Sequence, residues 1–306
     1  MMYRYSARKL NQLFISGELT AEAISRIDAE VSNEIEEATN AVREMSVPDP
    51  STAQDHVYGR AVDPVTEERG EAKDLTYQRA VNLALKTELE LRPEVVVYGE
   101  DVGFAGGIFG VTRGLHKQFG DERIFDTPIA ESAILGSAVG AAMEGMRPVV
   151  EIMWADFVFV ALDQIINQAA NVRYLNRSTL SAPMTIRMQQ GVTPGSCAQH
   201  SQSIEAILAH VPGIKVGMPS TPQDAYSMLR AAIADPDPTI IIESRSLYQE
   251  VGPVVPGGLL ESAEGAKAHA KGSDIALITW GPMLQSAMAA RDQLAEHGIS
   301  ASVLDL

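Results

Sequence analysis

The feature that most constrains the fold of this chain is an alternation of strand and helix patterns that begins at Leu75. Short apolar runs rich in β-branched residues predict buried strands at 95–98, 148–153, 184–188, 215–218, 239–243, 275–280 and 302–304. Helical patterns lie between them at 76–91, 130–145, 156–172, 203–210, 222–234 and 284–297. The alternation predicts an α/β fold with a parallel sheet and helices on both of its faces. Ligands of such sheets bind beyond the carboxyl ends of the strands.

The chain divides into four expected parts. Residues 1–45 form a helical segment, in which 17–45 predict an amphipathic helix capped by Thr20 with an acidic outer face. Residues 46–74, rich in Pro, Gly and charge, predict a linker. Residues 75–265 are expected to form the α/β domain, and 266–306 the truncated start of a second α/β domain.

Charge and cysteine content exclude several classes of protein. The 306 residues hold 24 Lys and Arg against 40 Asp and Glu, a net charge of −16, which disfavours binding to nucleic acid or to an anionic membrane. The single cysteine, Cys197, rules out a disulfide within the chain and a cysteine-based zinc site, and it favours a reducing compartment. No apolar run approaches the roughly 18 residues of a membrane span, and no apolar stretch follows the mildly basic start. We therefore expect a cytoplasmic protein.

A glycine-rich run, YGEDVGFAGGIFGVTRG, follows the first strand of the predicted domain. Its spacing matches neither of the glycine motifs that bind nucleotides, so it predicts a long loop. Glu100 and Asp101 nevertheless stand at the carboxyl end of the strand, where sites form.

A helix of mostly small residues is predicted to start at Thr127 or Pro128. Gly136 and Gly140 lie four residues apart, a spacing that lets two helices approach closely, within the fold or across a subunit interface. Glu131 stands in the first turn, where the helix dipole favours its ionised form and burial opposes it. By itself it is equally read as an ordinary first-turn acid.

Two further stretches contain residues suited to a binding site. Met153, Trp154, Phe157 and Phe159 follow a predicted strand, and such side chains either fill a core or stack on a flat heteroaromatic ligand. His200 lies in a Ser- and Gln-rich turn, where it is either a surface residue or an acid–base group. Residue patterns alone thus indicate an α/β enzyme or enzyme subunit.

Several blocks in a fixed order resemble one known family. They are YGEDVG, GLHKQFGDERIFDTPIAES, GAAMEGMRPVVEIMWADF, DQIINQAA, QHSQS, HVPGIKV and SDIALITWG. Together, over about residues 75–306, they resemble the beta subunit of thiamine-diphosphate-dependent 2-oxoacid dehydrogenases. The resemblance implies a transketolase-like pyrimidine-binding domain followed by the start of a transketolase C-terminal domain. Residues 17–45 are similar to the last helix of the alpha subunit, which suggests a piece of an alpha–beta fused protein.

The resemblance also assigns roles to individual residues. Glu131 matches the glutamate that hydrogen-bonds the aminopyrimidine ring of the cofactor and promotes formation of the carbon nucleophile. Phe157 matches the ring that stacks on the pyrimidine, and Met153 and Glu100 match other residues that line the same pocket. His200 matches the histidine near the reacting centre that handles the acyl group or its transfer to a lipoyl group.

A potassium site is implied in the same way, mostly through backbone carbonyls. The matching residues are Met184, Ala232, Ile233, Asp235 and Asp237. The family usually has Asn at the last of these positions.

The motif that binds the cofactor's diphosphate and magnesium, G-D-G followed by Asn, belongs to the alpha subunit of this family. Here Gly120-Asp121-Glu122 lacks the second glycine. The resemblance thus implies that an alpha subunit or alpha domain holds magnesium and shares the thiamine diphosphate, and that the isolated chain is inactive. Other implied partners are a second beta copy packed through the Gly136/Gly140 helix, a lipoyl acyltransferase core and the 2-oxoacid substrate.

The function that we expect is oxidative decarboxylation of a 2-oxoacid with acyl transfer to a lipoyl group. The stretches EDVGFAGGIFG and WADFVF look closer to branched-chain (2-oxoisovalerate) members than to pyruvate members. The alternatives are a pyruvate or acetoin dehydrogenase beta subunit, or a non-catalytic assembly fragment.

Overall fold

The computed structural model describes residue 13, residues 15–17, 20–60, 69–257 and 266–306. The basic start of the chain, part of the expected linker and the expected boundary at residue 265 lie outside the described residues. The chain separates into two compact units, Met1–Gln54 and Asp55–Leu306.

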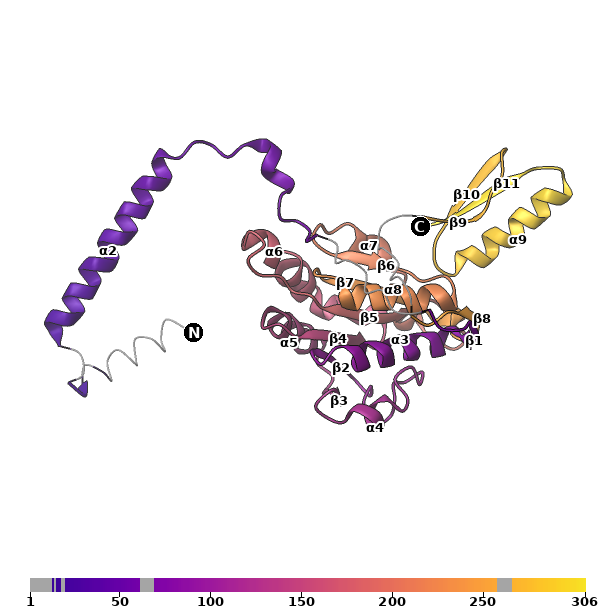
Figure 1. Ribbon diagram of the computed structural model, residues 1–306, viewed down its shortest axis with the longest axis horizontal. Coiled ribbons are helices and arrows are strands. Elements are labelled where there is room, and N and C mark those ends of the chain that lie inside the picture. Colours follow the sequence, from indigo (N-terminus) through magenta and orange to yellow (C-terminus); the bar gives the residue numbers. More distant parts are fainter. Residues whose placement is uncertain (1–12, 14, 18–19, 61–68, 258–265) are drawn as a thin grey trace. The chain divides into compact units, whose positions relative to one another are not determined.

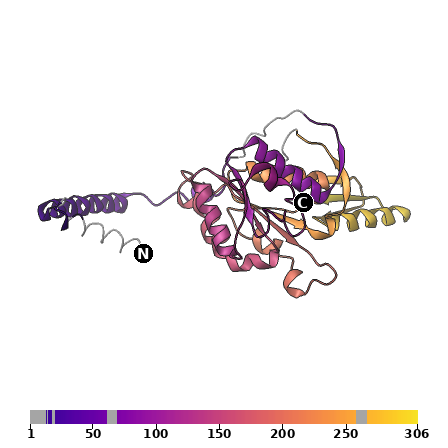
Figure 2. The same cartoon turned by 90° about the horizontal axis from the view of Figure 1, so that it is seen from below.

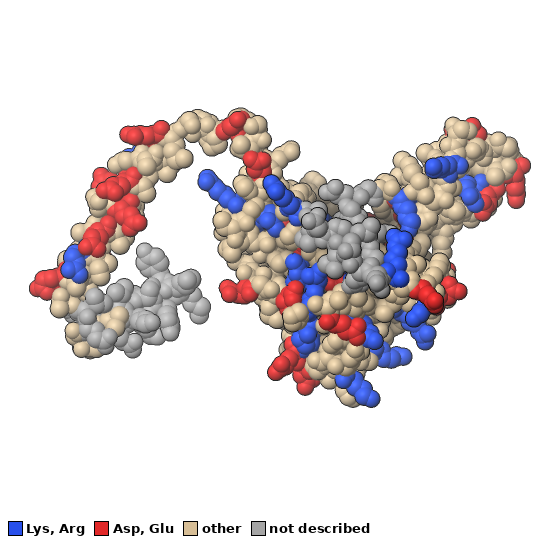
Figure 3. Space-filling model, in the orientation of Figure 1, with Lys and Arg blue, Asp and Glu red and all other residues tan. Residues whose placement is uncertain are grey.

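From residue 20 onward, the first unit consists of a long helix, α2 (Ala21–Glu44), and a short 3-10 helix, η1 (Pro50–Gln54), with the residues that cap and join them. The hydroxyl of Thr20 accepts the N–H of Ala23 at 3.2 Å, which confirms the expected N-cap. No residue of α2 is buried, and apolar Val31 and Ile35 are exposed. Acidic side chains gather along this helix in Figure 3.

The second unit is built on a six-stranded sheet in which every pairing is parallel, with the order β3-β2-β4-β5-β7-β6. The strands are β2 (Val95–Gly99), β3 (Ile124–Asp126), β4 (Arg147–Ile152), β5 (Thr185–Gln190), β6 (Lys215–Gly217) and β7 (Thr239–Ser244). Helices cover both faces of the sheet (Figures 1 and 2). The expected fold class is therefore confirmed.

Each face of the sheet carries its own hydrophobic core, because side chains of successive strand residues point to opposite faces. On one face, the strands pack against α5 (Glu131–Met143) and the 3-10 helix η2 (Ala155–Ala161). On the other face they pack against α3 (Tyr77–Leu91) and α8 (Pro222–Ala234). Both faces are thus covered, as is usual for a parallel sheet.

A buried ion network crosses three central strands. Arg187 on β5 donates to both carboxyl oxygens of Glu243 on β7, at 2.7 and 3.0 Å. It also donates to Glu151 on β4 at 2.7 Å. Burial opposes the charge of Arg187, but the two carboxylates outweigh it and raise the pKa of the guanidinium.

A smaller three-stranded sheet, with the order β10-β11-β9, carries the C-terminal part. Its strands are β9 (Lys267–Ala270), β10 (Ile275–Thr279) and β11 (Ala301–Asp305), and α9 (Met283–Glu296) joins β10 to β11. The hydroxyl of Ser220 donates to Asp305 at 2.9 Å, which ties this sheet to the main one. A further pair, β1 (Lys73–Thr76) and β8 (Val251–Val254), is antiparallel and was not predicted.

Two helix predictions need correction. The expected helix 156–172 is a series of short pieces: η2, the π-helix η3 (Gln164–Ala169) and α6 (Val172–Leu175). The carbonyl of Val160 accepts from the hydroxyl of Ser132 at 2.6 Å, so this turn is directed toward α5. The helix expected from Thr127 begins instead at Glu131, because the N–H of Thr127 donates to the carbonyl of Gly99 at the sheet edge.

None of the helices among the described residues is long and apolar enough to cross a membrane.

Candidate functional site

Two neighbouring strands end at the carboxyl edge of the main sheet and present candidate residues there. Gly99 of β2 lies opposite Glu151 of β4. Glu100 and Met153 follow the ends of these two strands, so both stand at the same edge. Both side chains are partly exposed, as residues that line an open site must be.

Glu131 reaches this edge from a helix. It is the first residue of α5, where free backbone N–H groups and the helix dipole favour a negative charge. Its charge acts on Glu100: burial raises the pKa of the Glu100 carboxyl, and the negative charges of Glu131 and Asp101 raise it further. Two carboxyl groups from distant parts of the sequence therefore interact at the site.

Phe157 and His200 form the aromatic part of the site. The half-buried Phe157 lies in η2, which is linked to the first turn of α5 by the hydrogen bond from Ser132 to Val160. The ring centroids of Phe157 and His200 are 5.4 Å apart, with an interplanar angle of 85°. Edge-to-face contact of this kind is favourable for aromatic rings.

His200 ends the short 3-10 helix η4 (Ala198–His200) and is partly exposed. Its Nδ1 lies 3.3 Å from the thiol sulfur of Cys197. Within the described residues Nε2 has no hydrogen-bond partner, so this nitrogen is the one available to a ligand. An imidazole in this position can give or take a proton.

The glycine-rich loop is a loop, as predicted, and it is anchored by side chains. The hydroxyl of Thr112 donates to the carbonyl of Val102 at 2.6 Å, and Gln78 of α3 donates to the carbonyl of Phe109. The Phe109 ring meets Trp154 edge-on at 5.2 Å. The loop thus forms one wall behind the aromatic part of the site.

Sequence reasoning missed two charged residues beside His200. Arg245 lies in the 3-10 helix η5 (Arg245–Leu247) after β7, and Asp156 lies in η2. Both are buried, with 8% and 7% of their surface exposed. No motif marks Arg245, because its partners are 45 or more residues away. Asp156 lies in the block GAAMEGMRPVVEIMWADF, but no residue pattern there distinguishes it as a site residue.

The chemistry of these residues fits the pyrimidine end of thiamine diphosphate. A flat heteroaromatic ring needs an aromatic surface and a carboxyl partner, which Phe157 and Glu131 offer. In addition, Oδ2 of Asp156 and Oγ1 of Thr127 are buried and have no partner among the described residues. Such polar atoms are normally satisfied by a ligand or a water molecule.

The same residues do not fit the diphosphate end. Glu100, Asp101 and Glu131 give this edge a negative charge, which repels phosphate. The described part of the chain contains no cluster of three or more His, Cys, Asp or Glu side chains able to hold a metal ion. This edge is therefore poorly suited to hold the diphosphate.

The residues assigned to potassium lie at the opposite, amino-terminal edge of the sheet. The carbonyl of Met184 accepts from Thr239, and one guanidinium nitrogen of Arg147 donates to the carbonyls of Ile233 and Asp235, at 2.7 and 3.0 Å. Carbonyl oxygens are suitable potassium ligands, since each has two lone pairs.

The two aspartates of this group are bonded to cations. Lys215 donates to the carboxylate of Asp235, and Arg173 donates to that of Asp237. The second carboxyl oxygen of Asp237 accepts the N–H of Gly59 at 2.8 Å. The side chain of Asp237 is thus fully engaged without a metal.

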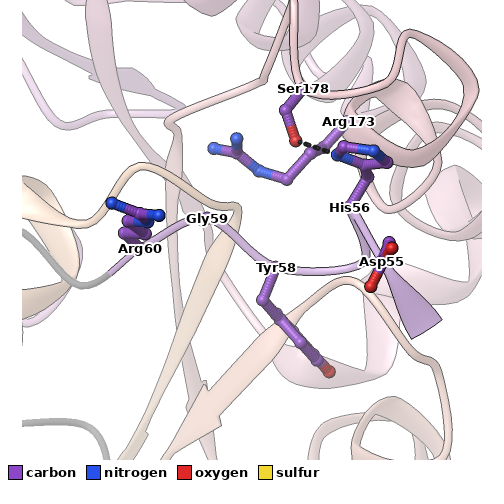
Figure 4. A pocket seen from close by; sticks show the side chains of 7 residues that line it. All are labelled: Asp55, His56, Tyr58, Gly59, Arg60, Arg173 and Ser178. Carbon is purple, nitrogen blue, oxygen red and sulfur yellow. Dashed lines mark hydrogen bonds between the residues drawn. The ribbon is translucent and has the colours of Figure 1, made fainter. Parts of the chain in front are cut away.

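A cavity of about 520 Å³ lies beside this edge and contains none of the predicted site residues (Figure 4). His56 and Ser178 share a hydrogen bond of 2.9 Å across it, and Tyr58 points away from Arg173. Its deepest cation, Arg173, is already paired with Asp237. The cavity is the seam where residues 55–60 dock on the domain.

Comparison with known proteins follows this division of the chain. Residues 73–251 match the family described as "Transketolase, pyrimidine binding domain", and residues 264–306 match "Transketolase, C-terminal domain". Over 233 residues, or 76% of this chain, the sequence is 45% identical to the 2-oxoisovalerate dehydrogenase subunit beta of Bacillus subtilis (strain 168), covering 71% of that protein.

Pyruvate-specific names occur among similar proteins as well. The pyruvate dehydrogenase E1 component subunit beta of Staphylococcus aureus (strain Mu50 / ATCC 700699) is 43% identical, and that of Acholeplasma laidlawii 39%, each over 76% of this chain. The chain covers 72% and 71% of these two proteins.

Solved structures show the same fold at low sequence identity. A split-gene transketolase, described as an inactive beta4 tetramer, superposes with a TM-score of 0.59 at 23% identity, over 76% of this chain and 70% of that one. A transketolase mutant from Pichia stipitis superposes with a TM-score of 0.60 at 17% identity, over 81% and 36%.

Proposed function

Since the chain belongs to the beta-subunit family of the thiamine-diphosphate-dependent 2-oxoacid dehydrogenases, we propose that it supplies the pyrimidine-binding half of an active site. The proposed reaction is oxidative decarboxylation of a 2-oxoacid, with transfer of the acyl group to a lipoyl group. The observation that carries the proposal is the gathering of Glu131, Phe157 and His200 at the carboxyl edge of one parallel sheet.

Thiamine diphosphate, when bound, supplies the carbon nucleophile and the electron sink of such reactions. The chain's own residues orient it and move protons. The carboxyl group of Glu131 would hydrogen-bond the aminopyrimidine ring and exchange a proton with it. Phe157 offers its half-buried ring as a stacking surface, and Met153 adds an apolar contact. A positioned acid–base group of this kind contributes about 10²–10⁴ in rate.

His200 is proposed to act on the substrate side. The thiol of Cys197 lies at Nδ1, which leaves Nε2 to give or take a proton at the substrate oxygen or at the lipoyl sulfur. Glu100 keeps a second carboxyl group beside Glu131, and its raised pKa, caused by burial and by the neighbouring acids, lets it hold a proton more readily than an ordinary glutamate.

We propose a branched-chain 2-oxoacid, such as 2-oxoisovalerate, as the substrate. Support comes from the 45% identity to a 2-oxoisovalerate dehydrogenase subunit, against 43% and 39% for two pyruvate dehydrogenase subunits. Pyruvate is the second candidate because these identities are close, and acetoin is the third.

An alpha subunit or alpha domain is the proposed partner that completes the site. It would hold the diphosphate, which the acidic edge around Glu100 and Glu131 repels, together with its magnesium. A lipoyl acyltransferase core is the proposed acyl acceptor. A second beta copy is proposed to pack on the exposed side of α5. A Cβ atom added at Gly140 on this side would have no neighbouring atom within 4 Å.

We also propose that potassium binds among the backbone carbonyls of Met184, Ala232, Ile233 and Asp235. Because the carboxylate of Asp237 is engaged by Arg173 and Gly59, the ion would depend on the carbonyls alone. The ion would share the carbonyls of Ile233 and Asp235 with Arg147.

The test is reconstitution of the chain with its alpha part and a lipoyl acyltransferase core. Turnover is measured with 2-oxoisovalerate, pyruvate and acetoin. Glu131→Gln is expected to abolish turnover while sparing assembly, because an amide cannot exchange a proton with the ring. Glu144→Gln, at the exposed opposite end of the same helix, is the matched control. Full activity of Glu131→Gln overturns the proposed role.

Calorimetry on the isolated chain tests the division of labour. Weak binding of thiamine diphosphate with magnesium is expected, since the diphosphate donors lie elsewhere. Tight binding by the chain alone contradicts this division, and lack of turnover with every 2-oxoacid in the complete assembly would favour a non-catalytic assembly role.

A further inference from the structure

The carbonyl group of His200 is held by a buried arginine. Nη2 of Arg245 donates to this carbonyl at 2.7 Å and also to the carbonyl of Gly191. Nη1 donates to the hydroxyl of Ser196 at 3.2 Å. One guanidinium group therefore connects the start, the middle and the end of the segment 191–200 and restrains its conformation.

The same arginine reaches the imidazole through Trp154. Its guanidinium carbon lies 4.1 Å from the centroid of the indole ring, a close cation–π contact. The indole in turn meets the His200 ring edge-on, with centroids 4.9 Å apart and planes at 89°. Phe157 contacts the imidazole from another side, at 5.4 Å. Arg245 thus supports both the backbone and, indirectly, the ring of His200.

Asp156 holds the chain immediately after His200. Its Oδ1 accepts the N–H groups of Ser201 and Gln202, each at 3.3 Å. The carbonyl of His200 is therefore bound to buried Arg245, and the N–H groups of Ser201 and Gln202 are bound to buried Asp156. The two side chains carry opposite charges. Such fixed dipoles leave the segment little freedom to rotate the histidine away from the site.

The way Arg245 is buried suggests a purpose beyond packing. Burial lowers the pKa of its guanidinium, and the charge of Asp156 only partly offsets this. No ion pair of Arg245 occurs within the parts of the chain that are described, and its Nε has no partner there. Burying a charge without a close counter-ion is unfavourable, and a neutral side chain would fill the same space at less cost. The hydrogen bonds of the guanidinium are therefore the reason for an arginine at this position.

We propose that Arg245 is a positioning residue, which fixes His200 so that Nε2 faces the reacting atoms. This inference rests on the proposed function of His200. The two terminal nitrogens of Arg245 donate to Gly191, Ser196 and His200, so its contacts are with the segment that carries the imidazole. It acts through the geometry of the segment, and an error of about 1 Å in such a geometry costs on the order of 100-fold in rate.

The test compares Arg245→Gln and Arg245→Lys with Arg79→Gln, a control on the exposed surface of α3. Hydrogen exchange of residues 191–201 and histidine-ring NMR signals are recorded on the full chain, with His200→Asn to assign the signal. For Arg245→Gln we expect exchange about 10-fold faster and a shifted or broadened His200 signal, because local opening becomes easier. Arg245→Lys, which keeps the charge but not the planar fork, is expected to lie between wild type and Arg245→Gln.

Activity is measured separately on the chain reconstituted with its alpha part. Arg245→Gln should lower kcat by about 100-fold with little change in KM, and added guanidinium ion should restore part of the loss. Unchanged exchange and an unchanged His200 signal in a folded Arg245→Gln variant would overturn the inference. Loss of folding in both Arg245 variants would also overturn it, since the arginine would then be a core residue.

Failure of the proposed function is recognised separately. If the wild-type assembly turns over no 2-oxoacid, the proposed function fails. The exchange and NMR measurements still decide whether Arg245 holds His200, because neither requires cofactor or turnover.

Discussion

The imidazole of His200 meets the indole of Trp154 edge-on, at a centroid distance of 4.9 Å. The two residues are 46 positions apart in sequence: His200 ends η4, and Trp154 is the N-cap residue of η2, shortly after β4. Their contact joins the candidate acid–base group to the sheet, and several expectations depend on this arrangement.

Replacing Trp154 should weaken the fold around the site. Trp154→Leu removes the contacts of the indole with Arg245 and His200, which are together worth about 1–3 kcal/mol by typical cation–π and aromatic-pair energies. Urea unfolding should show a loss of that size. Trp154→Phe keeps an aromatic ring and should lose less, so equal losses in both variants would show that these ring contacts contribute little.

Glu100 should make stability depend on pH. Burial and the charges of Glu131 and Asp101 raise its pKa above the ordinary 4.5, so the folded state binds this proton more tightly than the unfolded state. The stabilisation is complete below the unfolded pKa and is lost as pH rises through the folded pKa. Glu100→Gln should therefore raise Tm at pH 7 relative to wild type, and this advantage should vanish near pH 4. Exposed Glu122→Gln is the control.

Gly140 offers a test of the proposed second beta copy. It lies within α5, on the exposed side of the helix, where an added Cβ meets no atom within 4 Å. In the isolated chain, Gly140→Ala should stabilise by about 0.5–1 kcal/mol, because alanine loses less backbone entropy on folding. If two copies pack through this face, the methyl group should also weaken their association in sedimentation experiments.

Gly136→Ala is the matched comparison for Gly140. Its added Cβ would lie 3.0 Å from Oε1 of Gln164, so the same entropy gain is opposed by a clash. Its stability should fall below that of Gly140→Ala. Unchanged self-association of Gly140→Ala would place the subunit contact elsewhere.

The buried Arg187 should be costly to remove. Arg187→Met leaves Glu151 and Glu243 buried without their cation, and breaking a buried pair costs about 3–5 kcal/mol. The unfolding free energy should fall by that amount. Lys86→Met breaks the exposed pair with Glu90 and should change it by no more than about 0.5 kcal/mol. Equal effects of the two substitutions would show that the network contributes little.

Potassium should stabilise the protein if the carbonyl site is occupied. At about tenfold its Kd, one bound ion adds about 1.4 kcal/mol to the unfolding free energy. Tm should therefore be higher in potassium chloride than in choline chloride of equal concentration, and the difference should persist in Asp237→Asn if the carbonyls alone hold the ion. Equal Tm values in the two salts would show that potassium does not bind at these carbonyls.

Much of the fold was predictable because its signals are local. The caps Thr20 and Thr76 accept N–H groups three residues ahead, and the seven predicted strands all occur within a few residues of their expected bounds. Four short strands, β1, β3, β8 and β9, were missed. Each has three or four residues, too few for a clear pattern, and β1 pairs with a partner about 180 residues away.

The site was predicted only in part, for the same physical reason. The resemblance proposes Glu131, Phe157 and His200, since each stands in a recognisable block, and the structure brings Phe157 and His200 into contact. It could not identify Arg245, whose partners lie at Gly191 and His200. No local pattern connects residues that meet only after the strands between them have paired.

The sequence by itself determined the alternation of strands and helices, the family and the identity of the residues that carry the proposed chemistry. Hydrophobic periodicity and capping act over a few residues, so they can be read along the chain. Only the tertiary structure decided that the charge of Glu131 raises the pKa of Glu100. It also decided that Arg187 bonds to two carboxylates and that Arg245 donates to the carbonyl of His200. These relationships depend on the order of strands in the sheet, which brings distant side chains to one edge.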